Sequence, residues 1–235
     1  MKSTYGTGAF LLLNTGKDMV RSRTRLLATI AYRIAGETTY ALEGSVLSAG
    51  STVQWLRDGL GLLSQASDIS ALAQGADPES GVYLVPAFTG LGAPWWDADA
   101  RGAILGLTRG AGRAEIAQAA IDSTAHQTCD LLDAMAGDGV TTQTLRVDGG
   151  MARNDTILQR LADLTDIEVV RPKNTETTAW GAAFLAGLGA GLFRKLEDGR
   201  VIWKADREFK PGCDAGHRER MRAGWKDAVG RVRTG

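Results

Sequence analysis

The sequence has few of the residues on which metal centres and disulfide scaffolds depend. Its 235 residues include two cysteines, Cys129 and Cys213, and two histidines, His126 and His217. Neither cysteine belongs to a CxxC or similar cluster, so the spacing typical of zinc ligands is missing. Because no set of cysteines would form a disulfide framework, we expect a reducing, cytoplasmic setting.

An excess of charge of one sign and a long hydrophobic run are also missing. Lys and Arg together number 27, as do Asp and Glu, so the formal net charge is zero. Nothing therefore indicates the broad basic surface that attracts nucleic acid or an anionic membrane. The longest uncharged apolar run spans residues 179–193, which is shorter than the ~20 residues that cross a bilayer. We expect neither a nucleic-acid partner nor a membrane span.

Glycine, in contrast, is abundant. The chain has 30 glycines but only five prolines, a balance that favours tight turns and close backbone approaches over disorder. A chain of this length can bury a substantial core and is expected to form one domain, or one and a half.

The most informative stretch is LRVDGGMARND, residues 145–155. Thr144–Val147 has the composition of a strand, Gly149–Gly150 follow it, and Asn154–Asp155 open a segment with helical apolar spacing. Adjacent glycines permit a positive φ and let a flat ligand approach the main chain. The free N–H groups of the following helix favour a phosphate or an amide-rich ligand edge. A tight strand-to-helix turn without a ligand explains the same spacing, and the residues alone leave both interpretations open.

Around this stretch, strand and helix patterns alternate. Met1–Thr15 is predicted to form a strand, the glycine turn Gly6–Gly8 and a second strand. The other predicted strands are Leu26–Tyr32, Thr38–Leu42, Val82–Val85 and Ile167–Val170. The predicted helices are a segment near Ser51–Leu63, Arg113–Met135, Glu176–Leu192 with Thr175 as its cap, and about Arg218–Arg233. The polar segment Asp68–Ser80 is predicted to be a loop, and Asp97 is expected to pair with Arg101.

Two further stretches accompany the glycine pair: STYGTGAF at residues 3–10 and PAFTGLGAPWWDADARGAILGLTRG at residues 86–110. Together with VDGGMARND they resemble the FGGY carbohydrate kinases, in the expected order and as far as about Trp225. The segment GLGAPWWD is most similar to the glycerol kinases of that family. The resemblance implies an α/β fold of the ribonuclease H-like, actin-like ATPase class. It also implies that residues 1–235 form a single C-terminal kinase domain, with a core at about 1–195 and an extension at 196–235 packed on it, while the N-terminal kinase domain is absent.

The resemblance further implies a nucleotide site for ATP or ADP, with Mg²⁺ bound through the phosphates. Thr7 and the glycine turn would meet the phosphates, and the other positions would hold the adenosine. The residues that match the family's nucleotide contacts are Thr7, Gly8, Gly50, Gln54, Gly150 and Asn154. Judged by residue type alone, Gly6–Gly8 is a plain hairpin turn and Gln54 is a solvated surface residue.

For the substrate, the resemblance implies that Phe10 packs against the carbon edge of the polyol, although core packing is the ordinary role of such a residue. The family's catalytic aspartate lies upstream of the YGTG turn, and no residue here matches it, so we predict no catalytic residue. We also predict no metal ligand, because Asp97 and Asp99 have no third hard ligand at a suitable spacing.

The function that follows is ATP-dependent phosphorylation of glycerol to glycerol 3-phosphate, in which this chain supplies the nucleotide-binding half and is inactive alone. The expected partners are ATP and glycerol, and a homo-oligomer is compatible with the sequence. Two alternatives stay open. One is half of another FGGY sugar kinase, such as a ketopentose kinase, and the other is a non-catalytic nucleotide-binding or interaction module.

Overall fold

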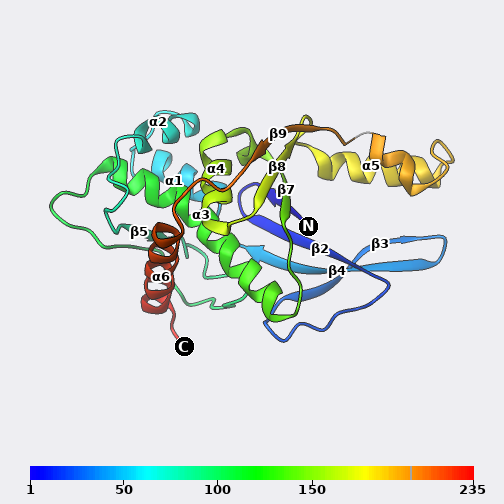
Figure 1. The fold of residues 1–235 in the computed structure, drawn as a ribbon, viewed down its shortest axis with the longest axis horizontal. Coiled ribbons are helices and arrows are strands. Elements are labelled where there is room, and N and C mark those ends of the chain that lie inside the picture. The colour runs from blue at the N-terminus through cyan, green and yellow to red at the C-terminus, as the bar shows by residue number, and fades with distance from the viewer. Residues whose placement is uncertain (202) are drawn as a thin grey trace.

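A seven-stranded mixed sheet organises the computed structural model, which describes residues 1–201 and 203–235. Its strand order is β3-β4-β2-β1-β7-β8-β9 (Figure 1). The strands are β1 (Lys2–Tyr5), β2 (Ala9–Gly16), β3 (Leu27–Ile34), β4 (Glu37–Val46), β7 (Thr144–Asp148), β8 (Glu168–Pro172) and β9 (Ala205–Phe209). A separate antiparallel pair joins β5 (Tyr83–Val85) to β6 (Ala103–Leu105).

The centre of the sheet determines where a ligand can bind. β1 pairs antiparallel with β2 and parallel with β7, and Thr4 lies opposite Asp148. Because the carboxyl ends of parallel strands meet at the same edge of a sheet, the turn after β1 lies beside the turn after β7. The glycine turn Gly6–Gly8 and the pair Gly149–Gly150 are thereby brought together, although they are far apart in the sequence.

Helices and short 3₁₀ segments link the strands and supply the core. The helices are α1 (Gly50–Asp58), α2 (Ile69–Ala73), α3 (Arg113–Gly137), α4 (Asp155–Thr165), α5 (Thr177–Gly189) and α6 (Ala215–Val232). The 3₁₀ segments are η1 (Ala66–Asp68), η2 (Gly150–Arg153) and η3 (Leu196–Val201). No helix among the described residues is both long enough and apolar enough to cross a lipid bilayer.

The longest helix, α3, is central to the core. Glu115 in its first turn accepts a hydrogen bond from the Gly112 N–H (2.8 Å), which satisfies one of the free donors at a helix start. Its buried residues pack with α4 and with inward-facing sheet residues such as Leu145 and Val147. Trp225 of α6 packs against the β5–β6 side in a further cluster that contains Val85 and Leu91.

Most predicted elements are confirmed, and the differences have physical reasons. α2 lies inside the segment predicted to be a loop, and β6 and β9 were not predicted. Thr175 does not cap α5: its carbonyl accepts from the Gly149 N–H (2.9 Å), and α5 begins after Glu176 without a side-chain cap. The predicted pairing of Asp97 with Arg101 is also wrong.

The Asp97 carboxylate accepts hydrogen bonds from Thr234 near the C-terminus and from backbone N–H groups of its own loop, at Asp99 and Ala100. Arg101 donates instead to the carbonyls of Ala98 and Ala100, both at 2.9 Å. The loop therefore forms its own local contacts, and the aspartate joins it to the end of the chain.

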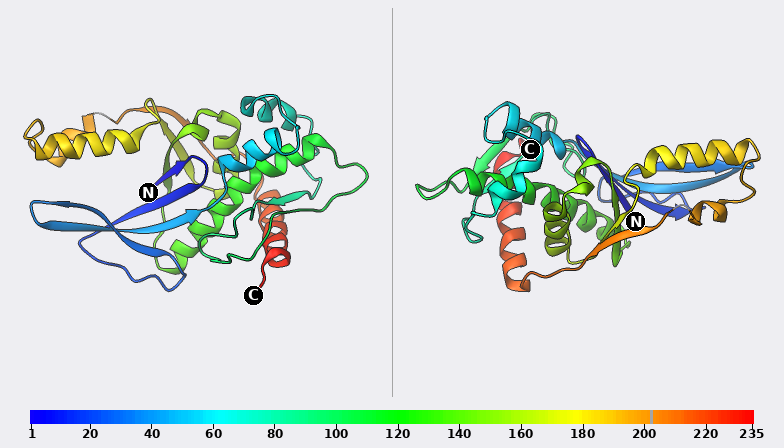
Figure 2. Two further views of the ribbon diagram at one scale, coloured as in Figure 1. Left: turned by 180° about the vertical axis from the view of Figure 1, so that it is seen from behind. Right: turned by 90° about the horizontal axis from the view of Figure 1, so that it is seen from above.

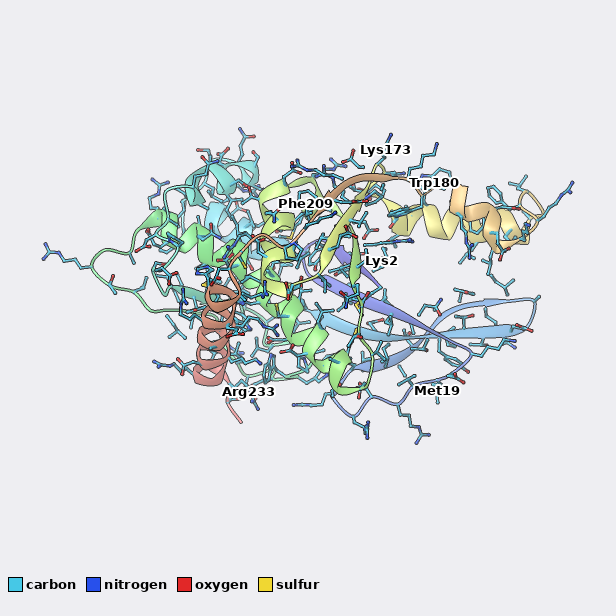
Figure 3. The ribbon with its side chains drawn as sticks, viewed as in Figure 1. Lys2, Met19, Lys173, Trp180, Phe209 and Arg233 are labelled. Atoms are coloured by element: carbon cyan, nitrogen blue, oxygen red, sulfur yellow. The ribbon has the colours of Figure 1, made fainter. Side chains whose placement is uncertain are left out.

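The helix α5 and the β3–β4 hairpin extend in the same direction beyond the rest of the molecule (Figure 2). Residues 177–193 carry no charged side chain, yet only Phe184 and Gly187 of α5 are buried. Trp180 near the start of the helix is exposed (Figure 3). A helix that is apolar on all sides is normally buried, so α5 presents an unusually apolar surface to solvent.

Candidate functional site

A cavity of about 790 Å³ lies at the sheet edge where β1 and β7 end. Its volume is within the ~300–1,000 Å³ typical of small-molecule sites. Four separate chain segments line it: the glycine turn, α1, the η1–α2 segment, and η2 with the start of α4. The lining residues predicted from the sequence are Thr7, Gly50, Gln54, Gly150 and Asn154. Five of the six predicted nucleotide residues therefore lie around one cavity.

The glycine turn and α1 are held together by their backbones. The Thr7 carbonyl accepts from the N–H groups of Ala49 (2.9 Å) and Ser51 (3.0 Å), and the Gly6 carbonyl accepts from Gly50 (2.9 Å). These carbonyls satisfy the donors that a helix start leaves unpaired. The Thr7 side chain is exposed at the cavity, and within the described part of the chain its hydroxyl has no hydrogen-bond partner.

Two glycines permit this close approach. A Cβ atom on Gly50 would lie 2.5 Å from the Gly6 carbonyl oxygen and 3.4 Å from the Met151 sulfur. A Cβ atom on Gly8 would collide with the Val46 carbonyl. Gly8 does not line the cavity. Its lack of a side chain lets the turn pack against the end of β4.

The glycine pair divides into two different environments. Gly149 has a φ of +89°, and a Cβ atom there would collide with the Tyr5 carbonyl of the neighbouring strand. Gly150 has no atom within 4 Å of the place where its Cβ would stand. The first glycine is therefore required by the turn, whereas the second leaves open space beside the cavity.

Asn154 joins the two walls of the cavity. Its Oδ1 accepts from the Ile157 N–H (3.2 Å), which caps α4. Its side-chain amide also contacts the Ser70 hydroxyl of α2, with Nδ2 at 2.8 Å and Oδ1 at 3.0 Å. The known contacts of Asn154 are thus structural, and they hold α2 against the start of α4.

Several lining residues were not predicted from the sequence. Ser67 lies in η1, just before the segment predicted to be a loop, and Ser70 lies within that segment on α2. Arg153 ends η2. Arg153 is largely exposed, and its guanidinium lies 3.8 Å from the carboxylate of Glu176. A polar segment without a hydrophobic period gives little sequence evidence for a binding site. Its place beside the cavity depends on how α2 packs against α3 and on the contact between Ser70 and Asn154.

The other predicted positions lie at or beyond the rim. Gln54 is exposed and lines the cavity one helical turn after Gly50. Phe10 lies on β2 between Thr4 and Ser45, is 51% exposed, and is outside the cavity lining.

The strongly shifted titratable groups lie in the core, away from the cavity lining. Burial lowers the pKa of His126 to about 3, and its ring stacks on Trp225 with 5.1 Å between ring centroids. Burial raises the pKa of Asp130 to about 6, although its Oδ2 accepts from the indole N–H groups of Trp95 (3.2 Å) and Trp225 (2.9 Å). These groups lie between α3 and α6, outside the cavity lining, and are not placed for acid–base chemistry in the cavity.

The cavity is chemically suited to binding rather than to bond breaking by its own side chains. Its floor includes Val53, Ile69 and Ile157, and its rim carries hydroxyl, amide and guanidinium groups. Its one carboxylate, on Asp155, is paired with Arg171 and Arg207. Among residues 1–201 and 203–235 no group of three or more His, Cys, Asp or Glu side chains is arranged to hold a metal ion.

Comparisons with known proteins agree with the motifs. Residues 1–190 match the C-terminal domain of the FGGY family of carbohydrate kinases. A glycerol kinase from Agrobacterium fabrum is 59% identical over 235 residues, which cover 98% of this chain and 47% of the relative. One from Alteromonas mediterranea is 56% identical over 232 residues, which cover 99% and 47%. The chain thus spans about half the length of the curated relatives that it matches.

Solved structures show the same correspondence. The crystal structure of Plasmodium falciparum glycerol kinase with ADP has a TM-score of 0.87 and 36% identity, covering 98% of this chain and 46% of that one. A gluconate kinase from Lactobacillus acidophilus has a TM-score of 0.82 at 22% identity, covering 98% and 46%. The second likeness concerns the fold alone.

Proposed function

The chain belongs to the FGGY family of carbohydrate kinases, and on this basis we propose that it is the nucleotide-binding half of an ATP-dependent glycerol kinase. Its fold is the ribonuclease H-like, actin-like ATPase fold of that family, as expected. The reaction would transfer the γ-phosphoryl group of ATP to glycerol and release glycerol 3-phosphate and ADP. In such reactions the protein mainly positions the phosphoryl group and stabilises its charge.

One observation carries this proposal: four distant chain segments meet around one cavity and bring Thr7, Gly50 and Gly150 to its surface. A plain hairpin turn and a plain strand-to-helix turn would not require a shared cavity of ligand size. The adenosine would lie against the open side of Gly150, and the phosphates would extend toward the exposed Thr7 hydroxyl. Magnesium would be held by the phosphates, because the carboxylate in the cavity is already paired with arginines.

Glycerol is the acceptor that the relatives favour. The matched relatives at 55–59% identity are glycerol kinases. The gluconate and xylulose kinases share 18–24% identity, and their likeness concerns the fold alone. Phe10 is proposed as a contact for the polyol. Its half-exposed ring stands on the sheet surface next to Thr4, one strand away from Asp148.

This chain alone is proposed to lack kinase activity, because no carboxylate in the cavity is free to act as a base. The remaining contacts would come from a second domain like the other half of the relatives. The apolar helix α5, with 79% of Leu192 exposed beyond its end, is a surface on which such a domain, or a second copy of the chain, would bury apolar area. A cytoplasmic setting is part of the same proposal.

The test is a titration of the ¹⁵N-labelled chain with ADP and Mg²⁺, followed by NMR. We expect shifts of the backbone amides of Thr7, Gly50 and Gly150 that saturate together, and little change at Phe10. An unchanged spectrum, or shifts confined to other parts of the surface, would refute the nucleotide site.

A further inference from the structure

We propose that Arg171 is a positioning residue for the nucleotide site: its guanidinium fixes the shape of the η2 turn that presents Gly150 to the cavity. Arg171 does not line the cavity, and it acts through the backbone of the turn and through Asp155. The inference rests on the proposed nucleotide site, but its structural part can be tested without any nucleotide.

The contacts of Arg171 with the turn are direct. Arg171 stands on β8, and its Nη1 donates to the Ala152 carbonyl (3.2 Å) and to Oδ1 of Asp155 (2.6 Å). Ala152 lies inside η2 and is fully buried, and Asp155 is the first residue of α4. One guanidinium nitrogen therefore holds the turn and the helix start that follow Gly150.

The opposite side of the guanidinium is anchored on β9. Its Nε and Nη2 contact Oδ2 of Asp206 at 2.9 and 2.7 Å, and its carbon lies 5.7 Å from the centre of the Phe209 ring. Figure 3 shows Phe209 at the end of β9, beside α4. Arg207 contacts the second oxygen of Asp155 and lies over the same ring at 5.0 Å. The Arg171 side chain is only 14% exposed, so salt screens these contacts less than surface pairs.

This geometry calls for arginine. The acceptors lie on two sides of a planar group, and a guanidinium offers five donors in a fixed fork. A lysine ammonium keeps the charge but is a single point, so it cannot serve Asp206, Asp155 and the Ala152 carbonyl in the same arrangement. The strand β9 is thereby coupled to the nucleotide turn, although no residue of β9 lines the cavity.

The decisive variant is Arg171→Lys, and the chain offers a matched control. Arg160 of α4 forms a similar fork with Asp122 of α3, at 2.6 and 2.9 Å, and its side chain is 20% exposed. It lies outside the cavity lining. Arg160→Lys therefore measures the cost of losing a mostly buried arginine–carboxylate pair that does not contact the turn.

Two measurements are made on both variants. Titration with ADP should show roughly tenfold weaker binding for Arg171→Lys, the effect of losing a charged hydrogen bond, and less than about twofold for Arg160→Lys. Amide hydrogen exchange without nucleotide should be faster in Arg171→Lys at Ala152 and Asn154, whose N–H groups form the hydrogen bonds of the turn. In Arg160→Lys these two amides should exchange as in the wild type.

Wild-type ADP affinity in Arg171→Lys, or equal losses in both variants, would overturn the proposal. If the wild type binds no ADP, the proposed function fails, and the exchange rates at Ala152 and Asn154 still decide whether Arg171 fixes the turn. If Arg171→Lys does not fold, Asp206→Asn weakens the same anchor from the β9 side. In that variant, unchanged exchange and ADP affinity would likewise overturn the inference.

Discussion

Replacing each glycine of the pair by valine separates ligand binding from folding. At Gly149 the φ of +89° and the Tyr5 carbonyl leave no room for a side chain. A residue other than glycine held at this positive φ with an extended ψ costs about 1–3 kcal/mol before any collision, so we expect Gly149→Val to lose roughly 3 kcal/mol or more. At Gly150 nothing lies within 4 Å of the new Cβ, so we expect Gly150→Val to cost less than about 1 kcal/mol.

For ADP binding, in contrast to stability, we expect Gly150→Val to have a specific effect. The valine at position 150 would fill the space proposed for the adenosine, so ADP binding should fall by tenfold or more in a folded protein. Wild-type affinity for ADP is expected to be on the order of 0.1–1 mM, because one domain encloses only part of the ligand. Circular dichroism and urea unfolding measure the fold, and NMR titration measures ADP affinity. Wild-type affinity in a folded Gly150→Val variant would show that the adenosine does not lie there.

Three further predictions concern other parts of the molecule. Burial raises the pKa of Asp130 to about 6, so the unfolded chain releases this proton at lower pH than the folded chain does. The free energy of unfolding should therefore fall by about 2 kcal/mol as pH rises from 4 to 6. Asp130→Asn should remove that decline in urea unfolding, and an unchanged decline would exclude this carboxyl as its source. Because α5 exposes apolar side chains, Leu185→Glu should reduce concentration-dependent self-association in light scattering more than Phe10→Ser does. A larger reduction in Phe10→Ser would place the associating surface on β2. Asn154→Ala should cost about 1 kcal/mol through the lost helix cap and weaken ADP binding by loosening α2, so full ADP affinity would show that the contact with Ser70 is not needed.

The sequence could predict what depends on local pattern. The apolar spacing of α3 and the strand–Gly–Gly–helix order around β7 specify their own elements, and both are found within a few residues of the prediction. The residues of the motifs could also be named in advance, because each motif is a short stretch of sequence that can be matched to the family position by position. That they share one cavity follows from the parallel pairing of β1 with β7, which local patterns do not reveal.

The features that escaped prediction depend on tertiary contacts. β9 is an edge strand whose residues 205–208 are exposed and mostly charged, so its sequence resembles a polar tail. α2 has only five residues, which is too short for a helical period. From the sequence, Arg171 was predicted only to end a strand. Its proposed role depends on contacts with Asp206 of another strand and with the Ala152 carbonyl. No spacing rule connects these positions.

The central claim is most directly tested by reconstitution with the other half of a relative. The Agrobacterium fabrum glycerol kinase is 59% identical to this chain over the region that the two share. The chain would be mixed with the other, N-terminal half of that kinase, and ADP release would be measured with and without glycerol. We predict no glycerol-dependent release by either piece alone and clear release by the mixture, abolished by Gly150→Val. Turnover by this chain alone would contradict the account, and so would a stable complex of the two pieces that binds ADP but phosphorylates no glycerol.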